Sequence, residues 1–391
     1  MEHYVRLLKI SLVLILIAGC DKEVLKEVTE ERLSYNADLA SSTSSSGGAG
    51  GQNDPGMITA GEWNDLEEWD FWSGLLKKEE YAAYLRKWNL LPDQRYAVEI
   101  FGSHGNPVIN ACVLLKDAYG EIIWSALTDN SGSAELWASL SNRDHIPVTL
   151  ETCNGFDLFV VRNPITFDKG VNRIQLGSSF LSSTLADIAF VVDATGSMGD
   201  ELEYIKVELM DVISEASQLS NIDPRVGALV YRDEGDEYVV RMSALDKDLS
   251  FAEEFMQKQS ADGGGDTPEA VHTALQIAIQ ELDWNPAARA RLLFLVLDAP
   301  PHDSQDVVET VSSLTKLAAQ KGIKIIPVSA SGIAKETEFL LRAMDIFTNG
   351  TYVFITDHSG IGNPHIEPSV GEYEVEFLNE LLIRLIAKYC K

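Results

Sequence analysis

The chain has 391 residues, 31 of them basic and 60 acidic, which gives a formal net charge of -29 at pH 7. This length is enough for two or three domains, each with its own core. Because nucleic-acid phosphates and anionic membrane surfaces repel such a charge, the composition argues against nucleic-acid binding and favours attraction of cations.

The N-terminus has the pattern of an export signal. Arg6 and Lys9 precede the apolar run Ile10 to Ala18, as in secretory signal peptides. The run is shorter than the about 20 apolar residues that span a bilayer. It ends in Ile17-Ala-Gly-Cys20, which resembles the bacterial lipobox, whose cysteine is acylated and becomes the new N-terminus. The resemblance predicts a lipoprotein signal peptide at 1–19 and a lipid on Cys20, which anchors an exported protein to the inner or outer membrane of the cell envelope. A plain cleaved signal is the alternative.

Residues 20–60 have the composition of a flexible tether, because Ser41 to Gly51 contains only Ser, Thr, Gly and Ala. Aromatic side chains are then concentrated in residues 61–92, which hold four of the seven tryptophans: Trp63, Trp69, Trp72 and Trp88. We expect a short helical segment here, with its rings packed on the next domain. An aromatic surface for ligand recognition is the alternative.

Residues 95–177 alternate apolar and polar positions in short runs between turns, which predicts β-strands. The stretches Gly105 to Val108 and Thr128 to Gly132 resemble the carboxypeptidase-regulatory-like β-sandwich, a small module without catalysis. The resemblance implies an all-β sandwich over this range. We expect Asp129 to serve a turn rather than an ion. Export permits a disulfide between Cys112 and Cys153, although the sequence leaves their pairing open.

Residues 184–391 alternate apolar runs with amphipathic helical patterns. Nearly continuous apolar runs are typical of strands covered on both faces, as in parallel sheets. The pattern therefore predicts an α/β domain with a doubly wound, mostly parallel sheet and a ligand crevice at the carboxyl ends of its strands. The apolar runs are Ile188 to Val192, Val226 to Tyr231, Leu292 to Leu297, Ile323 to Val328 and Tyr352 to Ile355.

Three polar motifs should meet at that crevice. Asp193-Ala-Thr195-Gly-Ser197 follows the first strand, and Asp298-Ala-Pro-Pro-His302 follows the third strand. Between them, Gly263-Gly-Gly-Asp266-Thr267-Pro-Glu269 precedes a helix. Helix capping is a local alternative, since Ser197 to Asp200 resembles a capping box and Asp266 or Thr267 would suit a cap before Pro268. Capping does not explain Asp193 or Asp298, so the pattern favours a site for a hard cation.

These motifs, in this order on an α/β pattern, resemble a von Willebrand factor type A domain with a metal-ion-dependent adhesion site. The resemblance implies Mg²⁺, with Mn²⁺ or Ca²⁺ as alternatives, held by Asp193, Thr195, Ser197 and Asp298, together with Asp266 or Thr267. Mg²⁺ prefers six oxygen ligands, and the neutral hydroxyls leave the ion electrophilic. If Asp266 also coordinates directly, three carboxylates overcompensate a divalent ion, which suits Ca²⁺ or Mn²⁺ better.

The same resemblance implies a membrane-anchored envelope protein that binds a protein, or another carboxylate-bearing ligand, through the ion. Asp233 and His302 are expected at the rim of the site. We expect no enzyme, because the chain has no Gly-x-Ser-x-Gly motif and no Cys/His pairing motif. A metal-dependent hydrolase, with His302 or Glu269 as general base, and a scaffold with a silent metal site are the alternatives.

Overall fold

The computed structural model describes residues 58–92, 94–138, 146–152, 158–177, 183–265, 267–330, 332–357 and 367–391. The signal peptide, Cys20, nearly all of the tether, Cys153 and Asp266 lie outside these ranges, so what was predicted for them stays a prediction. Within these ranges, no helix combines the length and apolar character that crossing a bilayer requires.

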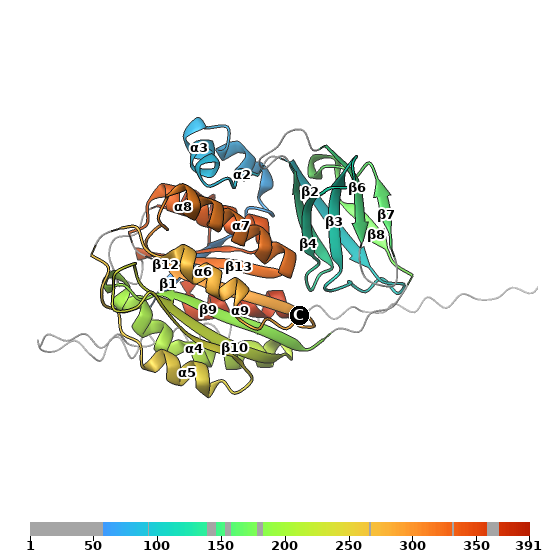
Figure 1. The fold of residues 1–391 in the computed structure, drawn as a ribbon. Coiled ribbons are helices and arrows are strands. Elements are labelled where there is room, and N and C mark those ends of the chain that lie inside the picture. The colour runs from blue at the N-terminus through green and yellow to red at the C-terminus, as the bar shows by residue number, and fades with distance from the viewer. Residues whose placement is uncertain are drawn as a thin grey trace, which may run out of the picture. The chain divides into compact units, whose positions relative to one another are not determined.

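A mixed sheet forms the centre of the C-terminal region (Figure 1), and its strand order in the described residues is β11-β10-β9-β12-β13-β14-β1-β15. The five apolar runs are its parallel strands, as predicted. The edges are antiparallel, which makes the sheet mixed. The parallel strands are β9 (Leu185–Asp193), β10 (Asp223–Tyr231), β12 (Ala290–Leu297), β13 (Ile323–Ser329) and β14 (Tyr352–Ile355), and the edge strands are β11 (Val240–Asp246), β1 (Thr59–Trp63) and β15 (Glu376–Phe377).

Helices cover both faces of this sheet (Figure 1). Alternate residues of β9 point to opposite sides, so Ile188 and Phe190 pack in one apolar cluster while Ala189 and Val191 pack in another. The first cluster contains α4 (Gly199–Ser220), α5 (Ser250–Gln257) and α9 (Leu378–Cys390). The second contains α6 (Val271–Gln280), α7 (Gln305–Lys321) and α8 (Lys335–Thr348). Burial on both faces explains why these strands read as continuous apolar runs.

Strand β1 was not expected, because residues 20–60 were predicted to be a tether and residues 61–92 to be helical. Its five residues have no strong period of their own, and pairing with β14 and β15 sets their conformation. Gly61 permits the close packing, since a Cβ there would lie 2.7 Å from the ring of Phe354.

The rest of the Trp-rich segment is helical, as predicted, and forms α2 (Trp69–Leu75) and α3 (Glu79–Lys87). Its rings pack on two parts of the chain: Trp72 stacks on Phe339 of α8 at 5.4 Å between ring centroids, and Trp69 lies 5.5 Å from Trp137. The buried Asp65 also binds the buried Arg342 of α8 through two hydrogen bonds of 2.8 and 2.6 Å. An ion pair therefore fixes the segment to α8.

Residues 94–175 form two small sheets, with strand orders β5-β2-β8 and β4-β3-β6-β7 in the described residues. Buried residues of these strands belong to the same apolar cluster as buried residues of α7 and α8. In this cluster the ring centroids of Trp124 and Trp137 lie 5.5 and 5.1 Å from that of Phe347. Cys112 is in a disulfide, whereas Cys390 is free and buried. The strands are β2 (Gln94–Phe101), β3 (Cys112–Asp117), β4 (Ile122–Leu127), β5 (Ser133–Ala138), β6 (Pro147–Thr152), β7 (Val160–Arg162) and β8 (Asn172–Gln175). The resemblance of this range to a known β-sandwich family stays a prediction.

Candidate metal site at the strand ends

Backbone hydrogen bonds bring the predicted loops together at the carboxyl ends of β9 and β10. The N–H of Ala194 donates to the carbonyl of Tyr231 at 2.8 Å, and the N–H of Asp262 donates to the carbonyl of Ala194 at 3.1 Å. Further along the same two loops, the N–H of Gly196 donates to the carbonyl of Gly263 at 3.2 Å. The first motif and the glycine loop before α6 are therefore in contact, as the sequence predicts.

Asp193 is fully buried and uses only one of its carboxylate oxygens. Its Oδ1 accepts hydrogen bonds from the N–H and the hydroxyl of Thr195, at 2.8 and 2.7 Å. Its Oδ2 is buried without a well-formed hydrogen bond in the described residues, although the buried hydroxyl of Tyr231 lies close enough to Asp193 to lower its pKa. A buried carboxylate oxygen without a donor is costly unless a cation or a proton satisfies it.

Ser197 connects the first motif to Asp298. The Ser197 hydroxyl lies 3.4 Å from that of Thr195 and close enough to Asp298 to lower the pKa of its carboxyl group. It does not cap α4, whose N-cap residue is Met198 and has no side-chain cap. The hydroxyl therefore lies beside Thr195 and Asp298, and the capping interpretation fails for Ser197.

The loop before α6 contributes a residue that the sequence analysis did not place among the metal ligands. Thr267 is exposed, and Asp266 lies outside the described residues. Glu269 is only 3% exposed, and its Oε2 is buried without a partner in the described residues. Its N–H donates to the carbonyl of Pro300, at 3.0 Å, so its backbone is fixed beside the loop that carries Asp298.

Among the described residues, no lysine or arginine side chain pairs with the carboxylates of Asp193, Asp298 and Glu269. Burial raises the pKa of Asp193 to about 7, against the hydrogen bonds from Thr195, and Asp298 raises it further. Burial, followed by the charges of Asp193 and Asp233, raises the pKa of Glu269 to about 8. Burial also raises the pKa of Asp298, and the hydrogen bond from Ser197 opposes this effect. Arg232, which follows β10, donates to the carbonyls of Ala194 and Ser260 instead of these carboxylates.

The two residues predicted at the rim lie together. Nε2 of His302 is 2.7 Å from Oδ1 of Asp233, and the ring of His272 lies edge-on to that of His302 at 6.1 Å between centroids. Asp236 fixes the neighbouring loop, because its Oδ2 accepts from the N–H groups of Asp233 and Gly264 at 3.1 and 3.0 Å. The rim therefore carries two acids and two imidazoles.

The donor set fits a hard cation, because three buried carboxylate oxygens have no well-formed hydrogen bond within the described ranges: Oδ2 of Asp193, Oδ1 of Asp298 and Oε2 of Glu269. The hydroxyls of Thr195 and Ser197 add two neutral oxygens. In the described part of the chain, no three side chains of His, Cys, Asp or Glu are already arranged as a metal-binding group. A cation would thus rely on the hydroxyls or draw the carboxylates closer than they lie here.

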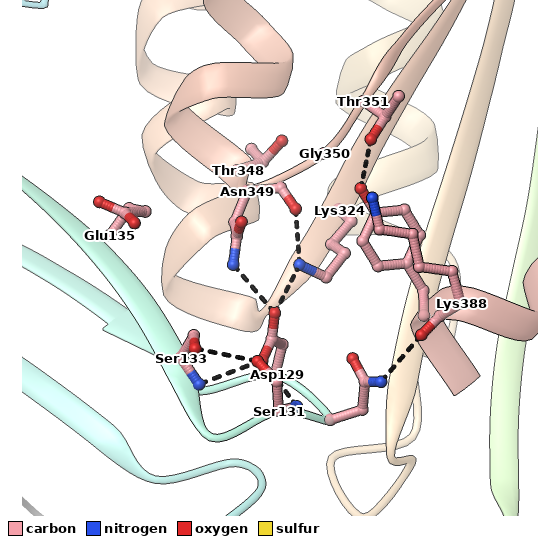
Figure 2. Close-up of polar contacts among 12 residues, drawn as sticks. Asp129, Ser131, Ser133, Glu135, Lys324, Thr348, Asn349, Gly350, Thr351 and Lys388 are labelled. Carbon is pink, nitrogen blue, oxygen red and sulfur yellow. Dashed lines mark hydrogen bonds and ion pairs between the residues drawn. The ribbon is translucent and has the colours of Figure 1, made fainter. Parts of the chain in front are cut away.

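Asp129 lies elsewhere and is paired (Figure 2). Its Oδ1 accepts from the N–H and hydroxyl of Ser131, at 2.9 and 2.6 Å. Its Oδ2 accepts from the ammonium of Lys324 and the side-chain amide of Asn349, both at 3.0 Å. The expected turn role is confirmed, and the same carboxylate also binds the small sheets to the start of β13.

Known proteins resemble parts of this chain. A family model described as von Willebrand factor A domain matches residues 187–360. An ariadne-like RING finger protein of Acanthamoeba polyphaga mimivirus is 31% identical over 121 residues, 31% of this chain and 12% of that protein. The von Willebrand factor A domain-containing protein 7 of Mus musculus is 33% identical over 153 residues, 37% of this chain and 16% of that protein. The chain thus spans less than a fifth of the length of either relative.

Among solved structures, the pilus adhesin SpaC of Lactobacillus rhamnosus GG, in its open conformation, is 12% identical. The similarity covers 54% of this chain and 30% of the adhesin, with a TM-score of 0.35. The family match coincides with the parallel strands and their polar ends. Residues 187–360 are therefore a von Willebrand factor A domain.

Proposed function

We propose that this chain is a lipid-anchored protein of the bacterial cell envelope that binds another protein through a divalent cation at the ends of β9 and β12. The observation that carries the proposal is the group of three buried carboxylate oxygens that have no well-formed hydrogen bond in the described part of the chain, beside two hydroxyls. Lipidation of Cys20 supplies the anchor in this proposal, and it rests on the N-terminal sequence alone.

Each residue has a role that follows from its chemistry. Asp193 and Asp298 supply negative charge from two different strands, and Thr195 and Ser197 supply neutral oxygens between them. The hydrogen bonds from Thr195 hold Oδ1 of Asp193, which leaves Oδ2 for the cation. Arg232 binds the backbone of the surrounding loops and so fixes their positions without neutralising the carboxylates.

A bound divalent cation would supply an electrophilic centre that oxygen ligands from a partner can complete. Mg²⁺ is the first candidate, with Mn²⁺ and Ca²⁺ as alternatives. The partner is expected to be a protein, or another ligand bearing carboxylates, that approaches past Asp233 and His302. Binding of this kind needs no catalytic step, so we propose an adhesive rather than an enzymatic role.

Cation titration by calorimetry and recovery of partners from envelope extract test this function together. We expect the full-length chain to bind Mg²⁺ or Ca²⁺ and to recover partners only with the cation present. Asp193→Asn should lose both properties. Asp211→Asn, which changes an exposed carboxylate on α4, should keep both. Recovery of the same partners in excess EDTA, or by Asp193→Asn, would contradict the proposal.

A further inference from the structure

Trp69 differs from its neighbours Trp72 and Trp88 in the surroundings of its ring. Trp72 and Trp88 are fully buried. Trp69 is only partly buried, and it borders a cavity of about 310 Å³ that is open to solvent. The sequence left open an aromatic surface for ligand recognition in this segment, and Trp69 is a ring in the position to provide one.

Three segments of the chain line this cavity. Helix α2 and the residue after it contribute Trp69, Ser73 and Leu76, which share one helix face because they are four and three positions apart. The start of β2 adds residues 94–95, and the turn at 166–168 adds a second aromatic ring. Small-molecule sites have volumes of about 300 to 1,000 Å³ and combine aromatic walls with a few polar groups. This cavity has both properties.

Arg95 fixes the two aromatic walls. Its Cζ atom lies 3.7 Å from the ring centroid of Phe167 and 5.1 Å from that of Trp69. The same guanidinium donates two hydrogen bonds of 2.8 Å to Glu135 and one of 2.9 Å to the carbonyl of Leu66. Arg95 and Glu135 are both buried. The walls are therefore held in place before a ligand binds, which lowers the entropic cost of binding.

The charges at the cavity favour a neutral ligand. Glu135 pairs with Arg95 through both carboxylate oxygens, so the guanidinium has little attraction left for an anion. The exposed carboxylate of Asp168 repels anions further. A cation would have to compete with Arg95 for the faces of the two rings, which already lie against a positive group.

We propose that this cavity binds a sugar residue of a neutral polysaccharide. A pyranose ring has a face of C–H groups, which packs on an aromatic ring such as that of Trp69, and a rim of hydroxyls that donate and accept hydrogen bonds. Ser73, Gln94 and Thr166 offer neutral donors and acceptors to those hydroxyls, and Asp168 offers an acceptor. These residues are not those of the candidate metal site, so the inference does not depend on the proposed function.

Calorimetric titration of the full-length chain with cellotetraose, chitotetraose and maltotetraose tests the proposal, with tetramethylammonium as a cationic probe. We expect at least one of the three sugars to bind with a Kd below about 10 mM, equally in Mg²⁺ and in EDTA, and tetramethylammonium not to bind. Trp69→Ala should weaken sugar binding by at least about tenfold, as for a tryptophan at the centre of a binding site. Ser73→Leu should also weaken it, because a larger side chain between Trp69 and Leu76 fills the cavity.

Tyr119→Ala is the matched control. It removes an aromatic ring that is 88% exposed on the turn after β3, and this ring does not line the cavity. The variant should bind the sugar like wild type. The unfolding temperature of each variant shows whether it is folded.

The other outcomes overturn the proposal. If none of the three sugars binds to wild type, the inference is wrong whether or not the variants fold. Binding that Trp69→Ala and Ser73→Leu both keep at wild-type affinity would place the sugar elsewhere, and if Trp69→Ala does not fold, Ser73→Leu decides. Binding of tetramethylammonium alone would assign the cavity to a cationic group. Sugar binding that is lost in EDTA would assign the sugar to the strand-end site, whose own tests are unaffected by these results.

Discussion

Two segments of this chain share the pattern Asp-x-Ser/Thr-Gly-Ser: Asp129 to Ser133 and Asp193 to Ser197. Their local structures are alike, because in each the Asp Oδ1 accepts from the N–H and the hydroxyl two residues later. They differ at the second oxygen. Oδ2 of Asp129 meets Lys324 and Asn349 near the start of β13, whereas Oδ2 of Asp193, at the end of β9, has no cationic partner and no well-formed hydrogen bond in the described residues.

This difference sets the acidity of the two groups. Burial alone would raise the pKa of Asp129, but the charge of Lys324 and the hydrogen bond from Ser131 bring it below the ordinary value. Burial raises the pKa of Asp193 to about 7, and Asp298 adds to the effect. The same short motif thus carries an ion-paired carboxylate, Asp129, near the start of β13. At the end of β9 it carries Asp193, a carboxylate without a cationic partner in the described residues.

The largest expected effect is a pH dependence that only the strand-end site should cause. Because the folded-state pKa of Asp193 is about 7, the folded protein holds this proton more tightly than the unfolded chain. Stability should therefore fall as pH rises from about 4 to about 7 in EDTA. At about 1.4 kcal/mol per pH unit, the contribution of Asp193 amounts to roughly 4 kcal/mol.

Urea denaturation of wild type and Asp193→Asn across this pH range, in EDTA, measures that contribution. Asp193→Asn should make the profile shallower below about pH 7, while the raised pKa of Glu269 keeps part of the slope, and Asp129→Asn should leave this part of the profile unchanged. The lowered pKa of Asp129 contributes stability above about pH 4 and loses it as pH falls through the folded value. Identical profiles for wild type and Asp193→Asn would contradict the contrast between the two carboxylates.

A second test makes Asp129 resemble Asp193 by removing its cation. Lys324→Met leaves a carboxylate at 15% exposure without its ammonium partner, and breaking such a pair should cost about 3 kcal/mol of unfolding free energy. Lys388→Met is the matched control, since Lys388 pairs with Glu67 at 39% and 64% exposure and should cost below about 1 kcal/mol. Equal losses in guanidinium denaturation would show that Lys324 does not neutralise a costly buried charge.

The smallest expected effect comes from the second donor to Asp129. Asn349 has a left-handed φ of 57°, so Asn349→Gly keeps the backbone and removes the hydrogen bond to Oδ2. The loss should be about 1 to 2 kcal/mol, as for hydrogen bonds to charged groups. Asn221→Gly changes an exposed left-handed Asn at the end of α4, where the change should stay within about 0.5 kcal/mol. Thermal unfolding that ranks Asn221→Gly as the more harmful change would reject this account.

Much of the fold could be predicted because local patterns carry it. The five apolar runs became the parallel strands, and the polar residues that follow β9 and β12 face each other as expected. Parallel strands have their carboxyl ends at one edge, so the approximate place of Asp193 and Asp298 follows from the order of the elements. Asp233 and His302 contact each other, and their role at the rim of a cation site stays a prediction.

Contacts between distant segments have no local signature, which is why the sequence predicted neither strand β1 nor the burial of Glu269. Strand β1 forms because it pairs with β14 and β15. Its partners lie far along the chain, since Ala60 pairs with Ile355 of β14. Glu269 follows Thr267 by two residues, and the sequence favours the hydroxyl because the family pattern does. Only the positions of Gly264 and Pro300 show that the glutamate enters the core.

The sequence by itself determined the α/β class, the strands that form the domain and the ends at which polar groups gather, because periodicity and strand order are local properties. It could not distinguish Asp129 from Asp193, since both occur in the same motif with the same short-range hydrogen bonds. Tertiary structure decided between them by bringing Lys324 to one carboxylate and further carboxylates to the other. The reason is physical: the energy of a buried charge depends on the groups that surround it, and folding alone determines which groups those are.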